Sequence, residues 1–136
     1  MIFFDLLLPS DIILKMKKIY YLKTCDTNRR ILKQIKAAVS EEIYKEFTFQ
    51  EIKTQPITVV QLEEMYQFTK NYEALFSKRA KRYKLLKEQI LTEKDYKQLI
   101  VDEYTFLKRP VIIMDTKIFV GNSKKNIENV LNELKK

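Results

Sequence analysis

Hydrophobic and polar positions change their period along this chain, and each change marks the boundary of an expected element. Residues 18–22 form a short apolar and aromatic run, which is typical of a buried strand. Apolar residues then recur at spacings of three and four: Ile31, Leu32, Ile35 and Val39. This recurrence predicts an amphipathic helix with Thr27 as its N-cap. Bulky residues within 44–52 indicate a second strand, which would run parallel to the first.

The middle of the chain is predicted to be helical. After the breaker at Pro56, Thr58 and Gln61 have the spacing of a capping box, so a helix should begin there. Residues 72–91 are expected to continue as a second helix, because apolar side chains recur through them at helical spacing. Thr92 would begin a third helix.

The last part of the chain returns to strands. Residues 111–114 are uniformly apolar, and Asp115 and Thr116 separate them from residues 118–120, which predicts a hairpin with a tight turn. An apolar stripe then predicts a C-terminal amphipathic helix: Ile127, Val130, Leu131 and Leu134. The order is β-α-β, three helical segments, then β-β-α. We therefore expect an α/β protein with a four-stranded mixed sheet, helices packed on it and a helical insertion at about residues 54–107.

The length of 136 residues corresponds to one domain. The first fourteen positions are apolar but are interrupted by Asp5, Pro9 and Asp11, so no run approaches the ~20 residues of a membrane span. They also lack the basic start and cleavage site of a signal peptide. Because Met16 precedes two lysines, we expect residues 1–15 to be an extension outside the fold and 16–136 to be the domain, in the cytoplasm.

Composition limits the chemistry. The chain has no histidine, which excludes histidine triads and histidine zinc ligands. One cysteine, Cys25, excludes an internal disulfide. The net charge of +8 favours an anionic partner: an oxyanion, a nucleic acid or an anionic surface.

Cys25 lies between the first predicted strand and the first predicted helix. The N-terminus of a helix carries positive potential, so a thiol there ionises more easily. Lys23, Arg29 and Arg30 add positive charge nearby, whereas Asp26 opposes it. We expect an accessible, reactive thiol. The alternative is that Cys25 is a small buried apolar residue, as lone cysteines often are.

Four segments carry a resemblance to a known family. The first holds Cys25, Thr27 and Arg29 in a C-x-T-x-R pattern, and the others are residues 72–79, 107–112 and 117–121. In this order they resemble the ArsC-type arsenate reductases and their YffB and Spx relatives. The resemblance covers about residues 17–134 and implies a thioredoxin-like fold with a helical insertion.

The resemblance implies a role for several residues. Cys25 would be the nucleophile, and Arg109 would bind an anion, because a guanidinium matches an oxyanion in geometry. Pro110 would be the cis-proline opposite the cysteine loop. Thr27, Arg29 and Arg79 would assist substrate binding. The alternative reading of Arg109 is a solvated surface charge.

The sequence also departs from the family pattern. Arsenate reductases of this family use an arginine in the insertion, where a gapless match has Ser77 and Arg79 lies two residues further on. They use another after the closing strand, where residues 121–125 contain none. Asn28 occupies the second position of the C-x-x-C pair found in many Spx regulators. A site with one thiol needs an external thiol to complete turnover.

Two functions remain open. The first is an arsenate reductase-like oxidoreductase that acts on a small oxyanion or a disulfide, with glutathione or glutaredoxin as co-substrate and no bound cofactor or metal. The second is an Spx-like regulator that binds RNA polymerase without catalysis. The basic run at 78–87 is interleaved with apolar residues, which favours a solvated helix face. We expect no membrane partner and no direct contact with nucleic acid.

Overall fold

The computed structural model describes residues 16–86, 89 and 91–136. The predicted extension, residues 1–15, lies outside these residues. Within them, none of the helices is long and apolar enough to span a membrane.

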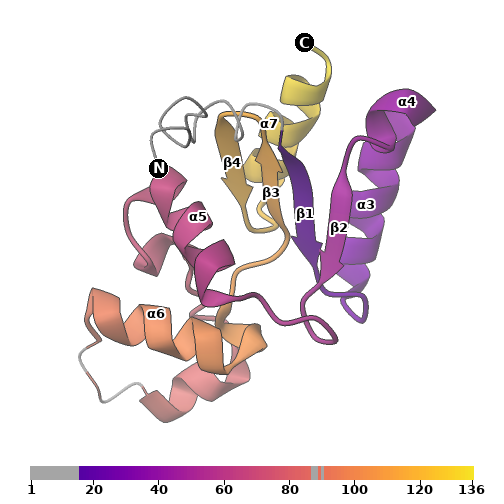
Figure 1. Ribbon diagram of the computed structural model, residues 1–136. Helices are drawn as coiled ribbons and strands as arrows, with labels where there is room; N and C mark the ends of the chain where they lie inside the picture. The colour runs from indigo at the N-terminus through magenta and orange to yellow at the C-terminus, as the bar shows by residue number, and fades with distance from the viewer. Residues whose placement is uncertain (1–15, 87–88, 90) are drawn as a thin grey trace, which may run out of the picture.

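Four strands form one mixed sheet: β1 (Lys17–Tyr21), β2 (Thr48–Glu51), β3 (Val111–Met114) and β4 (Lys117–Val120). Their order is β2-β1-β3-β4 (Figure 1). β2 runs parallel to β1, whereas β3 is antiparallel to both β1 and β4. The predicted α/β class and four-stranded mixed sheet are thereby confirmed.

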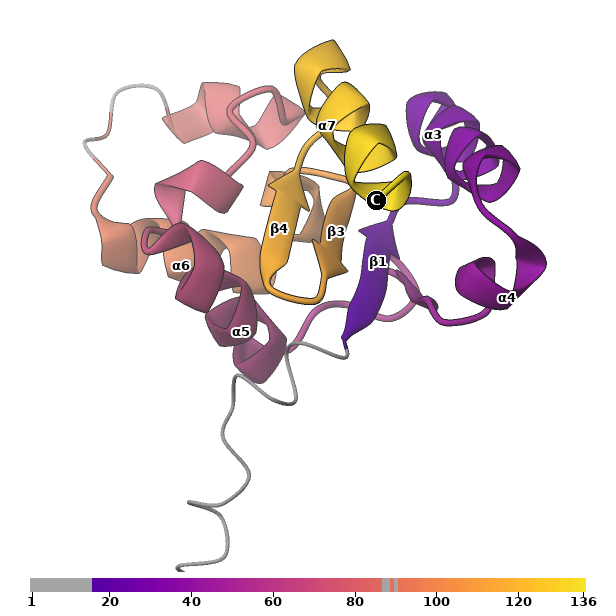
Figure 2. The same cartoon turned by 90° about the horizontal axis from the view of Figure 1, so that it is seen from above.

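Side chains along each strand alternate between the two faces of the sheet, and each face packs against its own hydrophobic core. Ile19 packs on the face covered by α3 (Asp26–Ala38) and α7 (Lys124–Leu134), whereas its neighbour Tyr20 packs on the other. That second face is covered by the insertion, which includes α5 (Val59–Thr69) and α6 (Glu93–Asp102) (Figure 2). The two central strands are therefore mostly buried, whereas the edge strand β2 keeps exposed side chains such as Phe49.

The insertion begins as its sequence predicts. Thr58 and Gln61 form a capping box at the start of α5, and Thr92 and Asp95 form another at α6. Gln61 also exchanges two hydrogen bonds, of 3.0 and 2.7 Å, with the buried amide of Gln50 in β2. This amide pair fastens the insertion to the edge strand of the sheet.

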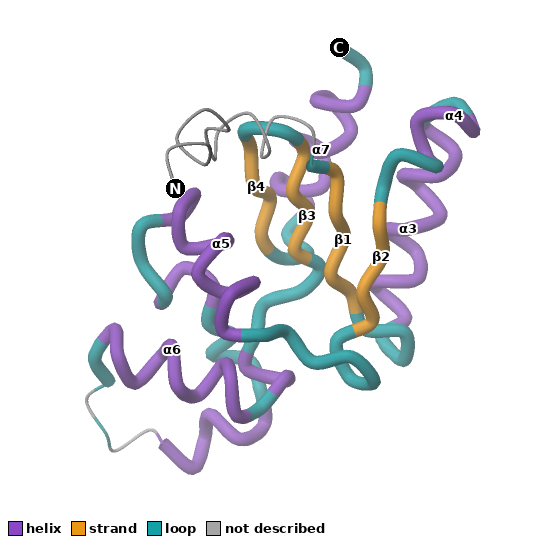
Figure 3. Tube along the Cα trace, viewed as in Figure 1, coloured by secondary structure: helices purple, strands orange, loops and turns teal. Residues whose placement is uncertain are grey.

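The prediction of one continuous helix over residues 72–91 is wrong. That region contains two short 3₁₀ helices, η1 (Glu73–Leu75) and η2 (Lys81–Leu86), joined by a loop (Figure 3). A third, η3 (Tyr104–Phe106), precedes β3. The chain leaves helical geometry at Phe76 because its backbone pairs with Leu107 in an isolated antiparallel bridge. Such pairing is non-local, so the apolar period does not reveal it.

Two further expectations near the N-terminus need correction. Tyr44 belongs not to a strand but to a short helix, α4 (Glu41–Tyr44), and β2 starts at Thr48. Thr27 is not the N-cap of α3, because the helix begins at Asp26 and its N-cap is Cys25. The thiol therefore lies closer to the helix terminus than the pattern predicts.

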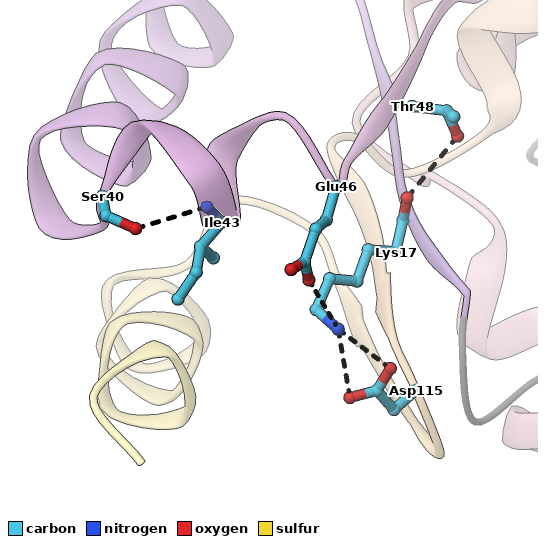
Figure 4. Close-up of polar contacts among 6 residues, drawn as sticks. All are labelled: Lys17, Ser40, Ile43, Glu46, Thr48 and Asp115. Atoms are coloured by element: carbon cyan, nitrogen blue, oxygen red, sulfur yellow. Dashed lines mark hydrogen bonds and ion pairs between the residues drawn. The ribbon is translucent and has the colours of Figure 1, made fainter.

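The end of the sheet at Lys17 is held by charged side chains (Figure 4). The Lys17 ammonium lies 3.1 Å from Asp115 in the β3–β4 turn and 3.4 Å from Glu46, which precedes β2. Thr48 donates a hydrogen bond of 3.5 Å to the Lys17 carbonyl. The predicted site residues meet at the opposite end of the sheet, away from these contacts.

Candidate active site

The strand register brings three distant segments to one end of the sheet. Tyr20 in β1 pairs with Val111, and Val111 pairs with Val120 in β4. The end of β1, the start of β3 and the end of β4 therefore lie side by side (Figure 1). Cys25 follows β1 and Arg109 precedes β3, so the topology itself brings them together.

A cavity of about 790 Å³ opens at this end of the sheet. Cys25 and Arg109 both line it, together with Ser77 and Arg79 from the insertion and Ser123 from the start of α7. Thr27, Arg29 and Pro110 are not among its lining residues. Of the residues predicted for the site, Cys25, Arg79 and Arg109 thus share one cavity.

Cys25 is presented by a tight turn after β1. Its N–H donates to the Leu22 carbonyl at 3.1 Å, and its own carbonyl accepts the N–H of Arg29 at 3.0 Å. The thiol is free, partly exposed and makes no capping hydrogen bond. It therefore lies at the positive end of α3 without a hydrogen bond to the helix terminus.

Two charged side chains hold this turn from outside the cavity. Arg29 donates to the Lys23 carbonyl at 2.7 Å and also pairs with Asp26. Glu51 accepts the Lys23 N–H at 3.0 Å. Burial raises the pKa of Glu51, but hydrogen bonds from the Lys23 and Thr54 backbones outweigh it and hold that pKa below its ordinary value. Arg29, predicted to bind substrate, is thus engaged with the cysteine turn.

The insertion supplies the opposite wall through its bridge. Besides the pairing of Phe76 with Leu107, the Ser77 N–H donates to the Phe106 carbonyl at 2.6 Å, and the Lys108 N–H donates to the Leu75 carbonyl at 2.8 Å. These bonds hold the segment at 77–79 beside the segment at 108–109. The arginines at positions 79 and 109 consequently reach the same cavity although thirty positions separate them.

Arg109 is anchored by its own backbone neighbourhood. Its Nη1 donates to the carbonyls of Thr105 at 3.1 Å and Leu107 at 3.3 Å. Its Nε is buried and has no hydrogen-bond partner among the described residues. The Arg109–Pro110 peptide bond is cis, which confirms that expectation. The guanidinium of Arg109 therefore keeps hydrogen-bonding capacity that the described residues do not use.

The charge of the cavity is predominantly positive. The lining includes Lys78, Arg79, Lys108 and Arg109 against one carboxylate, Glu73. The hydrogen bond between Lys78 and Glu73, 2.8 Å long, lowers the pKa of Glu73 and raises that of Lys78, so this pair is neutral together. Three cations are left, which suits an anionic ligand.

The loop after β4 also lines the cavity, but it contributes no positively charged side chain. Gly121 adopts a positive φ of 92°, and the side chain of Ser123 caps α7 by accepting the Asn126 N–H at 3.1 Å. Gly121, Asn122 and Ser123 all line the cavity. The arginine expected at this place from the family pattern is absent from residues 121–125, and Lys108, which sequence reasoning did not single out, lies across from Gly121.

No metal site is evident in the part of the chain that the structure describes, where no three Cys, Asp or Glu residues cluster suitably. The cavity presents one thiol beside a wall that carries cationic side chains.

Solved structures of similar proteins cover nearly the whole described domain. A YffB protein has a TM-score of 0.69 at 18% identity over 85% of this chain and 99% of its own. An ArsC family related protein from Bacteroides fragilis gives 0.65 at 20% identity, over 86% and 98%. An arsenate reductase from Vibrio cholerae gives 0.61 at 18% identity, over 86% and 98%. These likenesses show a shared thioredoxin-like fold.

Comparison at the level of sequence gives two results. No curated protein matches this sequence. The pattern of the ArsC family, in contrast, matches residues 20–130, which contain the cysteine turn, the insertion, the cis-proline and β4. The chain belongs to the ArsC family.

Proposed function

We propose that this protein is an arsenate reductase-like monothiol oxidoreductase, with Cys25 as nucleophile and glutathione or glutaredoxin as the external thiol. One observation carries the proposal: a partly exposed thiol at a helix N-terminus shares a cavity with Arg109, whose buried Nε lacks a partner. Three unpaired cations would hold an anion where Sγ can reach it.

The reaction on a disulfide needs only one thiol from the protein. The Cys25 thiolate attacks one sulfur, the S–S bond breaks, and the other sulfur leaves as a thiolate. The external thiolate then attacks the mixed disulfide on Cys25, which releases the Cys25 thiolate and carries the substrate sulfur away in a new disulfide. No second cysteine of this chain is involved.

The same machinery would reduce arsenate. Sγ forms a bond to arsenic while one oxygen leaves as water. An external thiolate then attacks Sγ, the electron pair of the S–As bond passes to arsenic, and arsenite leaves. Cys25 remains in a mixed disulfide that a second external thiol resolves. Arg109 would stabilise the charge on the oxyanion, with help from Arg79 and Lys108.

The size of the cavity supports a ligand larger than a bare oxyanion. Its volume of about 790 Å³ lies within the range of about 300–1,000 Å³ typical of small-molecule sites. A tripeptide thiol joined to Cys25 would place its carboxylates among the cations of the wall.

The test is a coupled assay in which NADPH, glutathione reductase, glutathione and glutaredoxin regenerate the external thiol. Arsenate and hydroxyethyl disulfide are offered separately to the wild type and to Cys25→Ser. We expect turnover of at least one substrate by the wild type and a fall to the background rate in the variant. Ser40→Ala, which removes the cap of α4 away from the cavity, is the control and should retain turnover. Turnover in Cys25→Ser equal to the wild type would refute the proposal.

A second candidate, an Spx-like regulator, is favoured by one surface. η2 exposes Lys81 and Lys84 beside Leu85, whose side chain is 80% exposed. Arg82 in the same turn pairs with Glu103 at 3.5 Å. Cations around an exposed aliphatic side chain suit an acidic protein surface with an apolar pocket.

The regulator hypothesis has its own readout. Immobilised protein is exposed to purified RNA polymerase, and Lys81→Glu combined with Leu85→Ser serves as the docking variant. Retention by the wild type and loss in the variant, without Cys25-dependent turnover, would favour regulation over catalysis. Absence of retention would exclude this candidate.

A further inference from the structure

We propose that Asn28 is a positioning residue for Cys25: its buried amide holds the turn that presents Sγ and thereby sets the rate at which the thiol reacts. This inference uses the proposed function only to identify Cys25 as the reacting group. It concerns a property of the free protein, the reactivity of one thiol, which can be measured without a substrate.

Asn28 is unusual for its environment. Its side chain is fully buried at 0% exposure, in the first turn of a helix whose inner face continues with Ile31 and Ile35. Among the described residues only Asn28 and Gln50 are buried polar side chains. Gln50 is satisfied by its amide pair with Gln61, but the Nδ2 of Asn28 finds no hydrogen-bond partner in the described part of the chain. Burying an unpartnered donor costs stability, so packing alone does not explain this residue.

The hydrogen bond that Asn28 does make acts on the cysteine turn. Its Oδ1 accepts the Leu22 N–H at 2.9 Å, in a buried position just after β1 ends. The carbonyl of the same Leu22 accepts the Cys25 N–H at 3.1 Å. Asn28 and Cys25 are therefore joined through both polar backbone groups of one residue, and the turn between β1 and α3 is closed from its inner side.

The consequence is a fixed relation between the thiol and the helix terminus. Cys25 is the N-cap, and its carbonyl accepts the first helical hydrogen bond from Arg29 at 3.0 Å. The potential of a helix terminus acts only within the first turn. If Leu22 lost its partner, the turn would gain conformations in which Sγ is displaced from the helix terminus, and fewer thiols would be aimed into the cavity.

The second helix on the same face contains a matched control. Asn126 occupies in α7 the position that Asn28 occupies in α3, three residues after the N-cap. It also fastens the preceding loop, since its Nδ2 donates to the Gly121 carbonyl at 2.7 Å. The loop that it holds carries no thiol. Removing this amide should loosen a comparable loop and leave the chemistry of Cys25 in place.

The experiment measures the second-order rate constant for alkylation of Cys25 by iodoacetamide across a range of pH, under native conditions. The variants are Asn28→Ala, Asn28→Leu and Asn126→Ala, and thermal melting is followed in parallel. Asn28→Leu keeps the branching of the side chain and removes the unpartnered donor but is larger than asparagine, whereas Asn28→Ala is smaller, so the two variants disturb the packing in opposite ways and melting identifies the one that is folded.

We expect alkylation at neutral pH to slow about ten-fold in each of Asn28→Leu and Asn28→Ala that melting shows to be folded. Asn126→Ala should stay within about two-fold of the wild type, although it also lowers the melting temperature. A purely structural role would change melting and leave the alkylation rate untouched.

Two results would overturn the proposal: wild-type alkylation in Asn28→Leu, or an equal loss of rate in Asn126→Ala. Failure of the proposed function would look different. If the coupled assay shows no Cys25-dependent turnover but alkylation still depends on Asn28, the positioning role stands and the assignment of the reaction falls.

Discussion

The two walls of the cavity are built from different kinds of backbone structure. On one side, α3 and α7 begin side by side and contribute Cys25 and Ser123 as their N-caps. On the other, two insertion segments joined by the bridge between Phe76 and Leu107 contribute the cations of the lining. The helix wall supplies the thiol, and the insertion wall supplies the cationic side chains.

This division separates reactivity from recognition. The thiol depends on the turn after β1, which substitutions of exposed side chains in the insertion would leave largely intact. The cations lie on an irregular segment whose exposed side chains, unlike the buried Leu75 and Phe76, can change without disturbing the sheet. We therefore expect substitutions in the insertion wall to alter substrate affinity and turnover, and substitutions in the helix wall to alter thiol chemistry or stability.

The largest effect is expected at Arg109. Arg109→Met removes a guanidinium that has a buried unpartnered Nε, and should lower kcat/KM by about 100-fold on an anionic substrate. Arg109→Lys keeps the charge but loses the planar fork, so we expect it to recover only part of the activity. Steady-state kinetics in the coupled assay measure both.

The control for this prediction is Lys97→Met. Lys97 pairs with Glu63 at 3.1 Å between two insertion helices and does not line the cavity, so its loss also removes one positive charge from the insertion. Equal losses in the variants at 97 and 109 would mean that net charge, not the geometry of this wall, controls the rate.

A smaller effect, on the free energy of unfolding, should distinguish the N-cap of α3 from the N-cap of α7. Ser123→Ala removes a side-chain cap and should cost about 1 kcal/mol of unfolding free energy. Cys25→Ser should cost nothing and could add up to about 1 kcal/mol, since the thiol makes no cap whereas a serine hydroxyl can accept from the first turn. Urea denaturation with an unchanged m-value measures both. A marked loss in Cys25→Ser would assign the thiol a structural role.

The smallest effect concerns acid stability. Because the folded-state pKa of Glu51 is depressed below its unfolded value of about 4.5, its ionised form stabilises the fold above that pH. This contribution is lost as pH falls through the folded pKa. Glu51→Gln should therefore melt earlier at neutral pH and show a flatter decline of melting temperature in acid. Glu128→Gln, an exposed carboxylate of α7, controls for the lost charge. An unchanged acid slope in Glu51→Gln would contradict the prediction.

The sequence predicts the sheet side of the molecule better than the insertion side. Alternation and capping motifs act within a few residues, so the strands and the helix starts at Thr58 and Thr92 could be predicted. The cis-proline followed from family resemblance. The extended segment at Phe76 could not be predicted, because its partner lies thirty-one positions away at Leu107.

The site shows the same limit. Cys25 and Arg109 could be predicted from motifs, and the structure brings them together. Arg29 shares the cysteine motif, yet it holds the turn through the Lys23 carbonyl, a contact that spacing alone does not reveal. The positioning role proposed for Asn28 could not be predicted from the sequence, because the burial of its amide depends on packing that only the structure shows.

The bridge between Phe76 and Leu107 also has a consequence for how the chain can change in length. It closes a loop of the chain at its neck, so that the exposed tip can differ in length while buried residues of the loop, such as Tyr96 and Ile100, stay in the core. Doubling the length of such a loop costs only about 0.6 kcal/mol in closure entropy. Additions at the tip, in the exposed turn around Lys84, should therefore be tolerated without displacing Arg79 or Arg109. The exposed tip, and not the buried neck, is therefore the position for grafting a peptide tag or a binding segment.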